Sequence, residues 1–237
     1  MTDRDRNLVI IPARAGSRRL PRKNVLPLAG KPMICWTIEA ALQANVSTKI
    51  VVTSDDPEVL NLLSQYPDNV IGVNRDPDLA SDSASTFDVV RDVIAREEQA
   101  GSHPETIILL QPTSPLRQSE DIRNAVEIFR RGGGESVVSV CKVDHPLAWC
   151  GQVDPDGKLH GLNLKTPRRS QEYPADYRLN GAVYVVGVNT VKEHGSLFSD
   201  SLLACVMPRE HSIDIDEEMD FELSRLMLEK RIAKSQR

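Results

Sequence analysis

The chain has 237 residues, which is long enough for one large domain or for one domain with a small appendage. Because 40 % of the residues are hydrophobic, they suffice to build a core, and a disordered chain is excluded. The 29 lysines and arginines against 34 aspartates and glutamates give a net charge of −5, so neither nucleic acid nor a membrane surface is expected to bind through bulk charge.

Short β-branched runs alternate along the chain with amphipathic helical stretches. Strands are predicted at residues 8–11, 49–53, 70–73, 106–110, 135–141, 181–188 and 204–207, and helices at residues 33–43, 57–65, 85–100, 119–131 and 216–234. Continuous apolar strands are typical of a sheet that is buried on both faces, and the β-α-β rhythm makes that sheet mostly parallel. The predicted fold class is therefore α/β, a three-layer sandwich with a Rossmann-like sheet.

The rhythm fails over about residues 143–178. This segment contains His145-Pro146, a basic stretch ending at Arg169, and Asp154-Pro155-Asp156-Gly157. The last of these matches the DxD pattern of metal-binding glycosyltransferases, but the glycine that follows favours a hairpin turn. We predict a small inserted hairpin subdomain within a single domain of residues 1–237.

The cysteines and the N-terminal segment bear on compartment. Cys35, Cys141, Cys150 and Cys205 lack metal-like spacing, so free thiols, buried or half-buried, are predicted. The charged start of the chain does not resemble a signal peptide, and no apolar run approaches the ~18 residues of a membrane span. A cytoplasmic protein with no membrane contact is expected.

The first strand leads into a loop rich in cations. Its five basic residues are Arg14, Arg18, Arg19, Arg22 and Lys23. Open α/β sheets bind ligands at the carboxyl ends of their strands, and a glycine such as Gly16 lets main-chain amides approach an anion. The loop matches neither GxGxxG nor GxxxxGK[ST]. It therefore favours a polyphosphate bound without a Rossmann or Walker fingerprint, with a merely solvated basic loop as the alternative.

Two carboxylates near the C-terminal end form a second candidate site. Asp214 and Asp216 alternate with Ile213 and Ile215, so a strand would place both carboxylates on one face. Two close carboxylates repel each other unless a cation neutralises them, and Mg²⁺ with bound phosphate does so. The alternative is that Asp216 only caps the final helix. Together with the basic loop, the pair favours phosphoryl or nucleotidyl transfer.

Two further polar segments follow strands. Residues 109–117 contain Gln111, Thr113, Ser114 and Arg117, which suit a polyhydroxylated substrate, although a polar turn explains them equally well. Residues 75–86 suit a base or a ribose, or simply the capped start of a helix. Neither GxSxG nor HExxH is present, which disfavours hydrolase triads and zincins.

Five motifs occur in the order found in one family. Residues 11–24 with 30–33 resemble the nucleotide loop of the sugar-acid cytidylyltransferases. Residues 79–82, 110–117, 180–184 and 212–216 extend the resemblance to the acylneuraminate branch, the CMP-sialic acid or nonulosonic acid synthetases, over residues 8–226. The resemblance implies a nucleotidyltransferase sheet, similar to that of GT-A glycosyltransferases, with residues 143–178 as a dimerisation subdomain. It also implies that CTP and a nonulosonic acid react to give the CMP-sugar and pyrophosphate.

The resemblance assigns roles to individual residues. It implies catalytic roles for Arg14, Lys23 and Asp216. The implied nucleotide-binding residues are Ala13, Arg14, Gly16, Ser17, Lys23, Asn24, Arg75 and Ala84. The implied sugar-binding residues are Gln111, Thr113, Ser114, Arg169, Arg178, Asn180, Tyr184 and Phe198. Asp214 and Asp216 would bind Mg²⁺ as the cofactor, and in a homodimer the inserted subdomain would reach the neighbour's active site.

Two departures concern the sugar. Ser17-Arg18-Arg19 stands where the branch commonly has Ser-Lys-Gly and is similar to the Kdo cytidylyltransferases, and Ala148 stands where some relatives have lysine. Residues 111–115 favour neuraminic or legionaminic acid as the substrate. Kdo and pseudaminic acid stay open as alternative substrates. The chain could instead be a different sugar nucleotidyltransferase, a nucleotide-dependent glycosyltransferase or a non-catalytic nucleotide-binding protein. The intact Arg14 and Lys23 argue against a non-catalytic protein.

Overall fold

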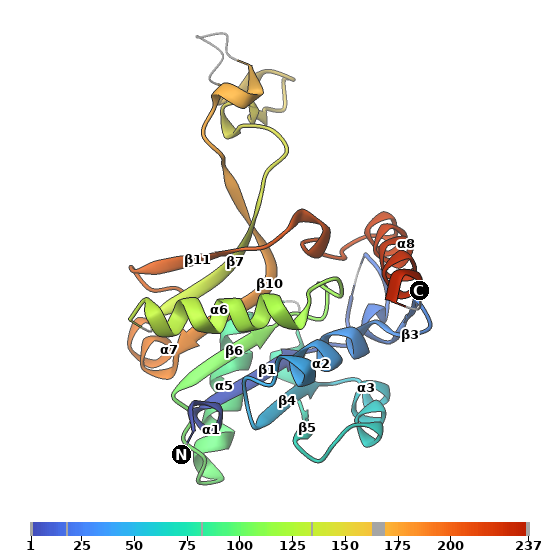
Figure 1. The fold of residues 1–237 in the computed structure, drawn as a ribbon, viewed down its shortest axis with the longest axis vertical. Helices are drawn as coiled ribbons and strands as arrows, with labels where there is room; N and C mark the ends of the chain where they lie inside the picture. Colours follow the sequence, from blue (N-terminus) through green and yellow to red (C-terminus); the bar gives the residue numbers. More distant parts are fainter. Residues whose placement is uncertain (1, 18, 82, 134, 163–168, 236–237) are drawn as a thin grey trace.

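A seven-stranded sheet lies at the centre of the computed structural model, which describes residues 2–17, 19–81, 83–133, 135–162 and 169–235 (Figure 1). In sheet order its strands are β11 (Leu202–Val206), β7 (Ser136–Lys142), β10 (Tyr177–Gly187), β6 (Thr106–Leu110), β1 (Asn7–Pro12), β4 (Lys49–Ser54) and β5 (Val70–Asn74). The pairs are parallel except those that β10 makes with β6 and β7. The prediction of a mostly parallel α/β sheet is confirmed.

Helices cover both faces of the sheet, as predicted. The α-helices of the described residues are α1 (Asp3–Arg6), α2 (Met33–Ala44), α3 (Pro57–Leu62), α4 (Pro77–Ala80), α5 (Thr86–Gln99), α6 (Ser119–Arg131), α7 (Val188–His194) and α8 (Glu218–Ser235). Helices α2 and α6 cross one face and α5 lies behind the other (Figure 1). Two separate buried clusters match these two faces, one with side chains of α2 and α6 and one with side chains of α5 and α7.

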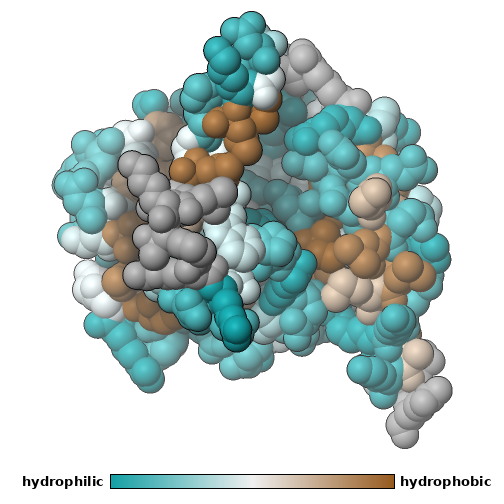
Figure 2. Space-filling model, turned by 90° about the horizontal axis from the view of Figure 1, so that it is seen from above, coloured by the Kyte–Doolittle hydropathy of each residue, from teal (hydrophilic) through white to brown (hydrophobic). Residues whose placement is uncertain are grey.

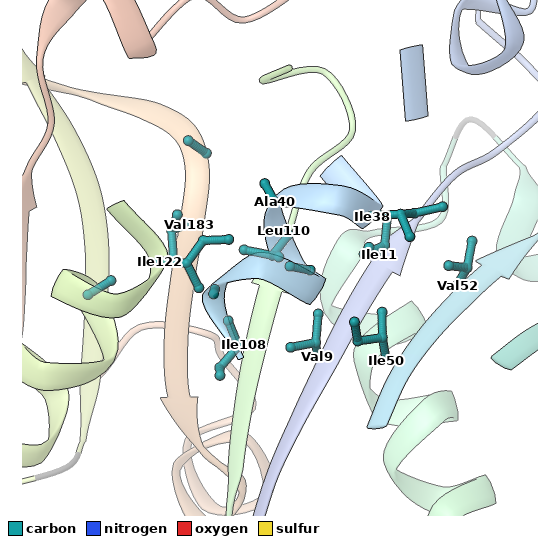
Figure 3. Close-up of a cluster of buried hydrophobic side chains, with 14 of the residues drawn as sticks. Val9, Ile11, Ile38, Ala40, Ile50, Val52, Ile108, Leu110, Ile122 and Val183 are labelled. Carbon is teal, nitrogen blue, oxygen red and sulfur yellow. The ribbon is translucent and has the colours of Figure 1, made fainter. Parts of the chain in front are cut away.

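The larger of the two clusters, which contains side chains of α2 and α6, explains why the strands contain continuous apolar runs. Val9 and Ile11 of β1 are fully buried and face Ile38 of α2, with Ile108 and Leu110 of β6 beside them (Figure 3). Alternate residues of the same strands point to the opposite face. Burial of each such side chain contributes about 1.5–3 kcal/mol, so the core fixes the strands whose ends carry the site.

The inserted segment rises away from the sheet between β7 and β10 (Figure 1). It contains a hairpin of β8 (Gln152–Val153) and β9 (Leu159–His160). Asp154 Oδ1 accepts hydrogen bonds from the amides of Asp156 and Lys158, at 3.0 and 2.8 Å, which closes the turn. The prediction that Asp154-Pro155-Asp156 forms a hairpin turn is confirmed. The predicted basic stretch lies largely outside the described residues, which resume at Arg169.

Several local predictions need correction. Residues 181–188 were expected as a strand, but the strand starts four residues earlier and helix α7 starts at Val188. Buried Val188 and Val191 hold this helix against the core, and this packing overrides the weak helix propensity of the sequence. The four cysteines are free as predicted, but Cys150 is exposed. Among the described residues, no helix is long and apolar enough to cross a membrane.

Candidate active site

A cavity of about 510 Å³ lies at the carboxyl edge of the parallel strands. The loops after β1, β5 and β6 line it, because the carboxyl ends of parallel strands meet at the same edge of the sheet. Seen from above, this end of the molecule is hollowed between apolar patches, and the hollow is largely hydrophilic (Figure 2). The predicted site residues that line the cavity are Arg14, Gly16, Ser17, Lys23, Asn24, Arg75, Ala84, Gln111, Thr113 and Asp216.

Two hydrogen bonds hold the basic loop in place at this edge. The side-chain amide of Asn24, which is 6 % exposed, donates to the carbonyl of Arg14 at 2.9 Å. The main-chain amide of Ala15 donates to Oδ1 of Asp55 at 2.8 Å. Asp56, not Asp55, caps α3, since its side chain accepts a hydrogen bond from the amide of Glu58. Asp55 therefore supports the loop.

The loop does not direct all of its cations at the cavity. Arg14, Arg19 and Lys23 line it, whereas Arg22 pairs with Glu58 and Asp56 near α3. Arg18 lies outside the described residues. Arg19 was not among the predicted site residues, although the density of basic residues around it was a usable signal. The cavity thus receives three described cations from this loop.

A single carboxylate meets two of these cations. Lys23 Nζ donates to the carbonyl of Ile215 at 2.7 Å and lies 3.4 Å from Asp216 Oδ1. Arg19 Nη2 lies 2.8 Å from the other carboxylate oxygen of Asp216. Because the side chain of Lys23 is only 14 % exposed, solvent and salt screen its ion pair less than they would screen a surface pair. Asp216 therefore joins the two ends of the chain across the cavity.

Arg75 brings a buried guanidinium to the wall of the cavity that Ala84 and Thr86 also line. It is 5 % exposed, and its Nη2 donates to the carbonyl of Thr53 at 2.7 Å. Burial lowers its pKa, and the nearby Asp55 carboxylate partly opposes that shift. Arg75 is thus a fixed hydrogen-bond donor rather than a mobile surface charge.

Asp214 differs from Asp216 in its surroundings. Its Oδ1 is buried and has no hydrogen-bond partner among the described residues. Burial raises the pKa of the Asp214 carboxyl, a hydrogen bond from Thr113 opposes the shift, and the charge of Asp216 adds to it. The segment of residues 212–216 is not a strand, contrary to expectation. Ile213 and Ile215 nevertheless pack in the cluster beside α8, as expected, but Asp216 lines the main cavity whereas Asp214 lines a separate cavity.

The two carboxylates fit a divalent cation. Among the described residues, no three His, Cys, Asp or Glu side chains gather into a metal cluster. Mg²⁺ does not need such a cluster, because it commonly takes one or two carboxylates and completes its shell with substrate phosphates and water. The unpartnered Oδ1 of Asp214 and the carboxylate oxygens of Asp216 beside it are suitable ligands for such an ion.

Gly181 leaves room for the side chains of Gln111 and Asp214, both of which lie beside it. Its φ is +73°, and a Cβ at this position would lie 3.0 Å from Gln111 Oε1 and 3.5 Å from Asp214 Oδ2. An alanine here would therefore combine backbone strain with a tight contact. The residue lies in a predicted motif, but its positive φ and its neighbours are visible only in the fold.

An aromatic pair lines a smaller cavity of about 410 Å³ that shares Gln111 and Thr86 with the first. The rings of Tyr184 and Phe198 meet edge to face, with centroids 6.2 Å apart. Burial raises the pKa of the Tyr184 hydroxyl, so it stays a neutral hydrogen-bonding group. The two cavities together offer a charged end and an aromatic end on either side of Gln111.

The structure does not bring the other predicted residues to the main cavity. Ala13 and Ser114 are fully buried behind it. Asn180 is also buried, where its Oδ1 accepts from Ser139 at 2.6 Å and its Nδ2 donates to Ser212 at 2.9 Å. The side chain of Asn180 thus joins β7 and β10 to the segment that carries the carboxylates.

The two predicted arginines of the inserted segment lie elsewhere. Arg178 lines a separate cavity of about 710 Å³, together with Asp214. Arg169 is exposed at the start of the short helix η4 (Ser170–Glu172), within the inserted segment itself. Within one chain, therefore, the two arginines do not meet at the main cavity.

The fold and this cavity define a nucleotidyltransferase: an α/β sheet whose first loop carries cations toward a carboxylate at the opposite end of the chain. The sequence model described as "Cytidylyltransferase" matches residues 8–147. A CMP-N,N'-diacetyllegionaminic acid synthase of Legionella pneumophila is 38 % identical over 232 residues, which cover 94 % of this chain and 97 % of the relative. The chain belongs to the acylneuraminate branch of the cytidylyltransferase family.

Two further proteins are similar to the chain. An N-acylneuraminate cytidylyltransferase of Escherichia coli is 32 % identical over 96 % of this chain, which spans 53 % of that longer protein. The solved CMP:2-keto-3-deoxy-manno-octonic acid synthetase, complexed with CTP, has a TM-score of 0.70 and 20 % identity, and the match covers 95 % of this chain and 99 % of that one. At this identity the last similarity concerns the fold alone. The predicted nucleotidyltransferase fold is confirmed.

Proposed function

We propose that this enzyme transfers CMP from CTP to the anomeric hydroxyl of a nonulosonic acid, of the N-acetylneuraminate or legionaminate type, in a Mg²⁺-dependent reaction that releases pyrophosphate. The observation that carries the proposal is the joining of two cavities at Gln111, one with cations and a carboxylate, the other with the Tyr184–Phe198 pair. The named functions of the relatives, which include legionaminic acid, neuraminate and pseudaminic acid enzymes, support the substrate class.

The charged cavity suits a nucleoside triphosphate. Arg14, Arg19 and Lys23 offer positive charge to the phosphates, and Gly16 leaves room for the main chain to approach them. Arg75 offers a fixed donor to the base. Nucleotidyl transfer depends mostly on positioning and on neutralising charge, so the enzyme requires little covalent chemistry of its own.

Asp214 and Asp216 would hold Mg²⁺. When bound, the ion would neutralise the triphosphate and polarise the phosphorus that is attacked. Asp216 is already paired with Lys23 and Arg19. We infer that the three groups exchange partners when nucleotide and metal bind, so that the cations turn to the phosphates and the carboxylate to the ion.

The aromatic cavity suits the sugar acid. Gln111 and Thr113 would hydrogen-bond its hydroxyl or acyl groups, and Tyr184 and Phe198 would contact its apolar face. The anomeric oxygen attacks the α-phosphorus and its proton passes to solvent, while the bond from that phosphorus to the bridging oxygen breaks and pyrophosphate leaves with the bonding electron pair. No covalent enzyme intermediate forms.

A homodimer would complete the site. The inserted segment exposes Leu147, Trp149 and Leu159, and β10 exposes Leu179 where it leaves the sheet. Exposed apolar side chains in this number are typical of an interaction surface. We infer that a second copy covers them and that Arg169 or Arg178 thereby meets the sugar carboxylate.

A parallel substrate panel tests the proposal. Pyrophosphate release is measured with CTP, Mg²⁺ and either N-acetylneuraminate, N,N'-diacetyllegionaminate, pseudaminate or Kdo. We expect turnover with one of the first two acids and loss of turnover in EDTA. Turnover with Kdo or pseudaminate alone would contradict the sugar class, and none with any acid would contradict the reaction.

A further inference from the structure

The interior holds a cation that the proposed chemistry does not use. Arg117 lies between β6 and α6 and is only 2 % exposed. Its Nη1 donates to two main-chain carbonyls, that of Gln111 at 3.1 Å and that of Ala182 at 2.8 Å. Its Nε and Nη2 have no hydrogen-bond partner among the described residues. Burial lowers the pKa of this guanidinium to about 9, and the carboxylate of Asp121 opposes the shift.

Such a cation is a costly choice for a core position. An apolar side chain of similar volume would avoid the desolvation of a charge and of two unpaired donors. Stability alone therefore gives no reason for arginine here. The reason must lie in the two carbonyls to which it donates.

The two carbonyls lie where the β-ladder between β6 and β10 stops. The last paired residues in this direction are Leu110 and Val183. Gln111 and Ala182 are the next residues along each strand, and no ladder bond joins them. Beyond them β10 continues to Gly181, beside which the side chains of Gln111 and Asp214 both lie. Arg117 Nη1 thus joins the two chains at the point where they enter the site.

We propose that Arg117 is a positioning residue that holds the main chains of Gln111 and Ala182 together and thereby sets the Gln111 side chain opposite Asp214. The inference rests on the proposed function, in which Gln111 contacts the sugar acid. Arg117 itself touches neither substrate. Loss of Arg117 should therefore lower kcat/KM for the sugar acid more than it weakens CTP binding. The cations proposed to bind the CTP phosphates come from the loop after β1.

The test compares Arg117→Met with Arg231→Met as a matched control. Arg231 is partly buried rather than fully buried, but its pKa is likewise lowered by burial, and its Nη1 donates to the carbonyl of Leu116 in the same loop. That carbonyl belongs to a residue that does not line the main cavity. Measurements are the Kd for CTP without sugar acid, kcat and KM for the sugar acid that the wild type uses, and Tm.

For Arg117→Met we expect kcat/KM for the sugar acid to fall at least about tenfold while the Kd for CTP stays within about twofold. Arg231→Met should leave both values near those of the wild type. Arg117→Lys keeps one donor group on a shorter side chain, so its kcat/KM for the sugar acid should lie between that of Arg117→Met and that of the wild type. If Arg117→Met does not fold, Arg117→Lys replaces it in the test, and we expect kcat/KM for the sugar acid to fall about threefold in that variant.

Three results would overturn the inference. They are unchanged sugar-acid kinetics in a folded Arg117 variant, an equal loss of CTP binding and sugar-acid use, or an equal effect of Arg231→Met. A wild type without turnover would overturn the proposed function and this inference with it. An active wild type beside an unimpaired Arg117 variant would overturn this inference alone.

Discussion

The ammonium nitrogen of Lys23 lies 3.4 Å from Oδ1 of Asp216, although the two residues are 193 positions apart in the chain. Arg19 contacts the other oxygen of the same carboxylate. The residues proposed to bind the triphosphate and the metal therefore neutralise each other. The proposed exchange of partners on ligand binding leads to the first two predictions.

Asp216→Ala should abolish turnover in Mg²⁺ while leaving the fold intact, because Asp216 is a half-exposed residue assigned to the metal. The same change should tighten CTP binding in EDTA about threefold or more, since a negative charge beside the phosphates is removed. Titration of CTP in EDTA, pyrophosphate release in Mg²⁺ and Tm check these outcomes. Glu217→Ala is the matched control, because Glu217 also approaches Arg19, at 3.8 Å, but does not line the cavity. Retained turnover in Asp216→Ala would refute its role.

Lys23→Gln should lower kcat/KM for CTP by about a hundredfold or more, because a partly buried cation at the phosphates is lost. Arg22→Gln provides the control within the same loop. Arg22 pairs with Glu58 and Asp56 and does not line the cavity, so its loss should change kcat/KM less than about threefold. Steady-state kinetics with CTP as the varied substrate measure both effects. Equal effects of the two changes would show that the loop acts only through its total charge.

Asp55→Ala should raise KM for CTP several-fold, because the amide of Ala15 loses its acceptor and the basic loop loses a support. Asp56→Ala should instead lower the free energy of unfolding by about 1 kcal/mol, the usual effect of losing a helix cap, with little change in KM. Kinetics and urea unfolding of both variants separate the two roles. The reverse assignment of effects would contradict the structure.

Gly181→Ala should reduce kcat/KM for the sugar acid at least about tenfold, since the new Cβ would press on Gln111 Oε1. Gly157→Ala is the control for backbone strain alone. Gly157 has a φ of +80° in the β8–β9 hairpin, and a Cβ there would meet nothing within 4 Å. Both variants should lose about 1 kcal/mol of stability. Wild-type sugar-acid kinetics in a folded Gly181→Ala protein would show that Gln111 does not need its observed position.

Much of the fold could be predicted because its signals are local. The strands β1, β4 and β6 each contain a continuous apolar run (residues 8–11, 50–52 and 107–110), as expected for strands buried on both faces, and their bounds were predicted within about two residues. Helix α7 was missed because its first four residues, 188–191, are weak helix formers, of which Val188 and Val191 pack into the core. Tertiary packing decided that element.

The site was predictable as far as chemical type shows in the sequence. Clustered cations and alternating carboxylates indicated Lys23 and Asp216 before any fold was known. Asp55 was missed because its role depends on β1 and β4 being neighbours in the sheet. Asn180 was expected to contact the sugar because of its motif, but the structure buries its amide in internal hydrogen bonds. Polar type alone cannot separate a ligand contact from a structural one.

The most direct test of the central claim follows the phosphates of CTP. The enzyme is incubated with Mg²⁺, the preferred sugar acid and CTP labelled either at the α- or at the γ-phosphate, and the products are separated. We predict that the α-label appears in a CMP-sugar, that the γ-label appears in pyrophosphate, and that the two products form in equal amounts. Release of CDP with the γ-label in phosphate, or a labelled CMP that is not joined to the sugar acid, would contradict direct cytidylyl transfer.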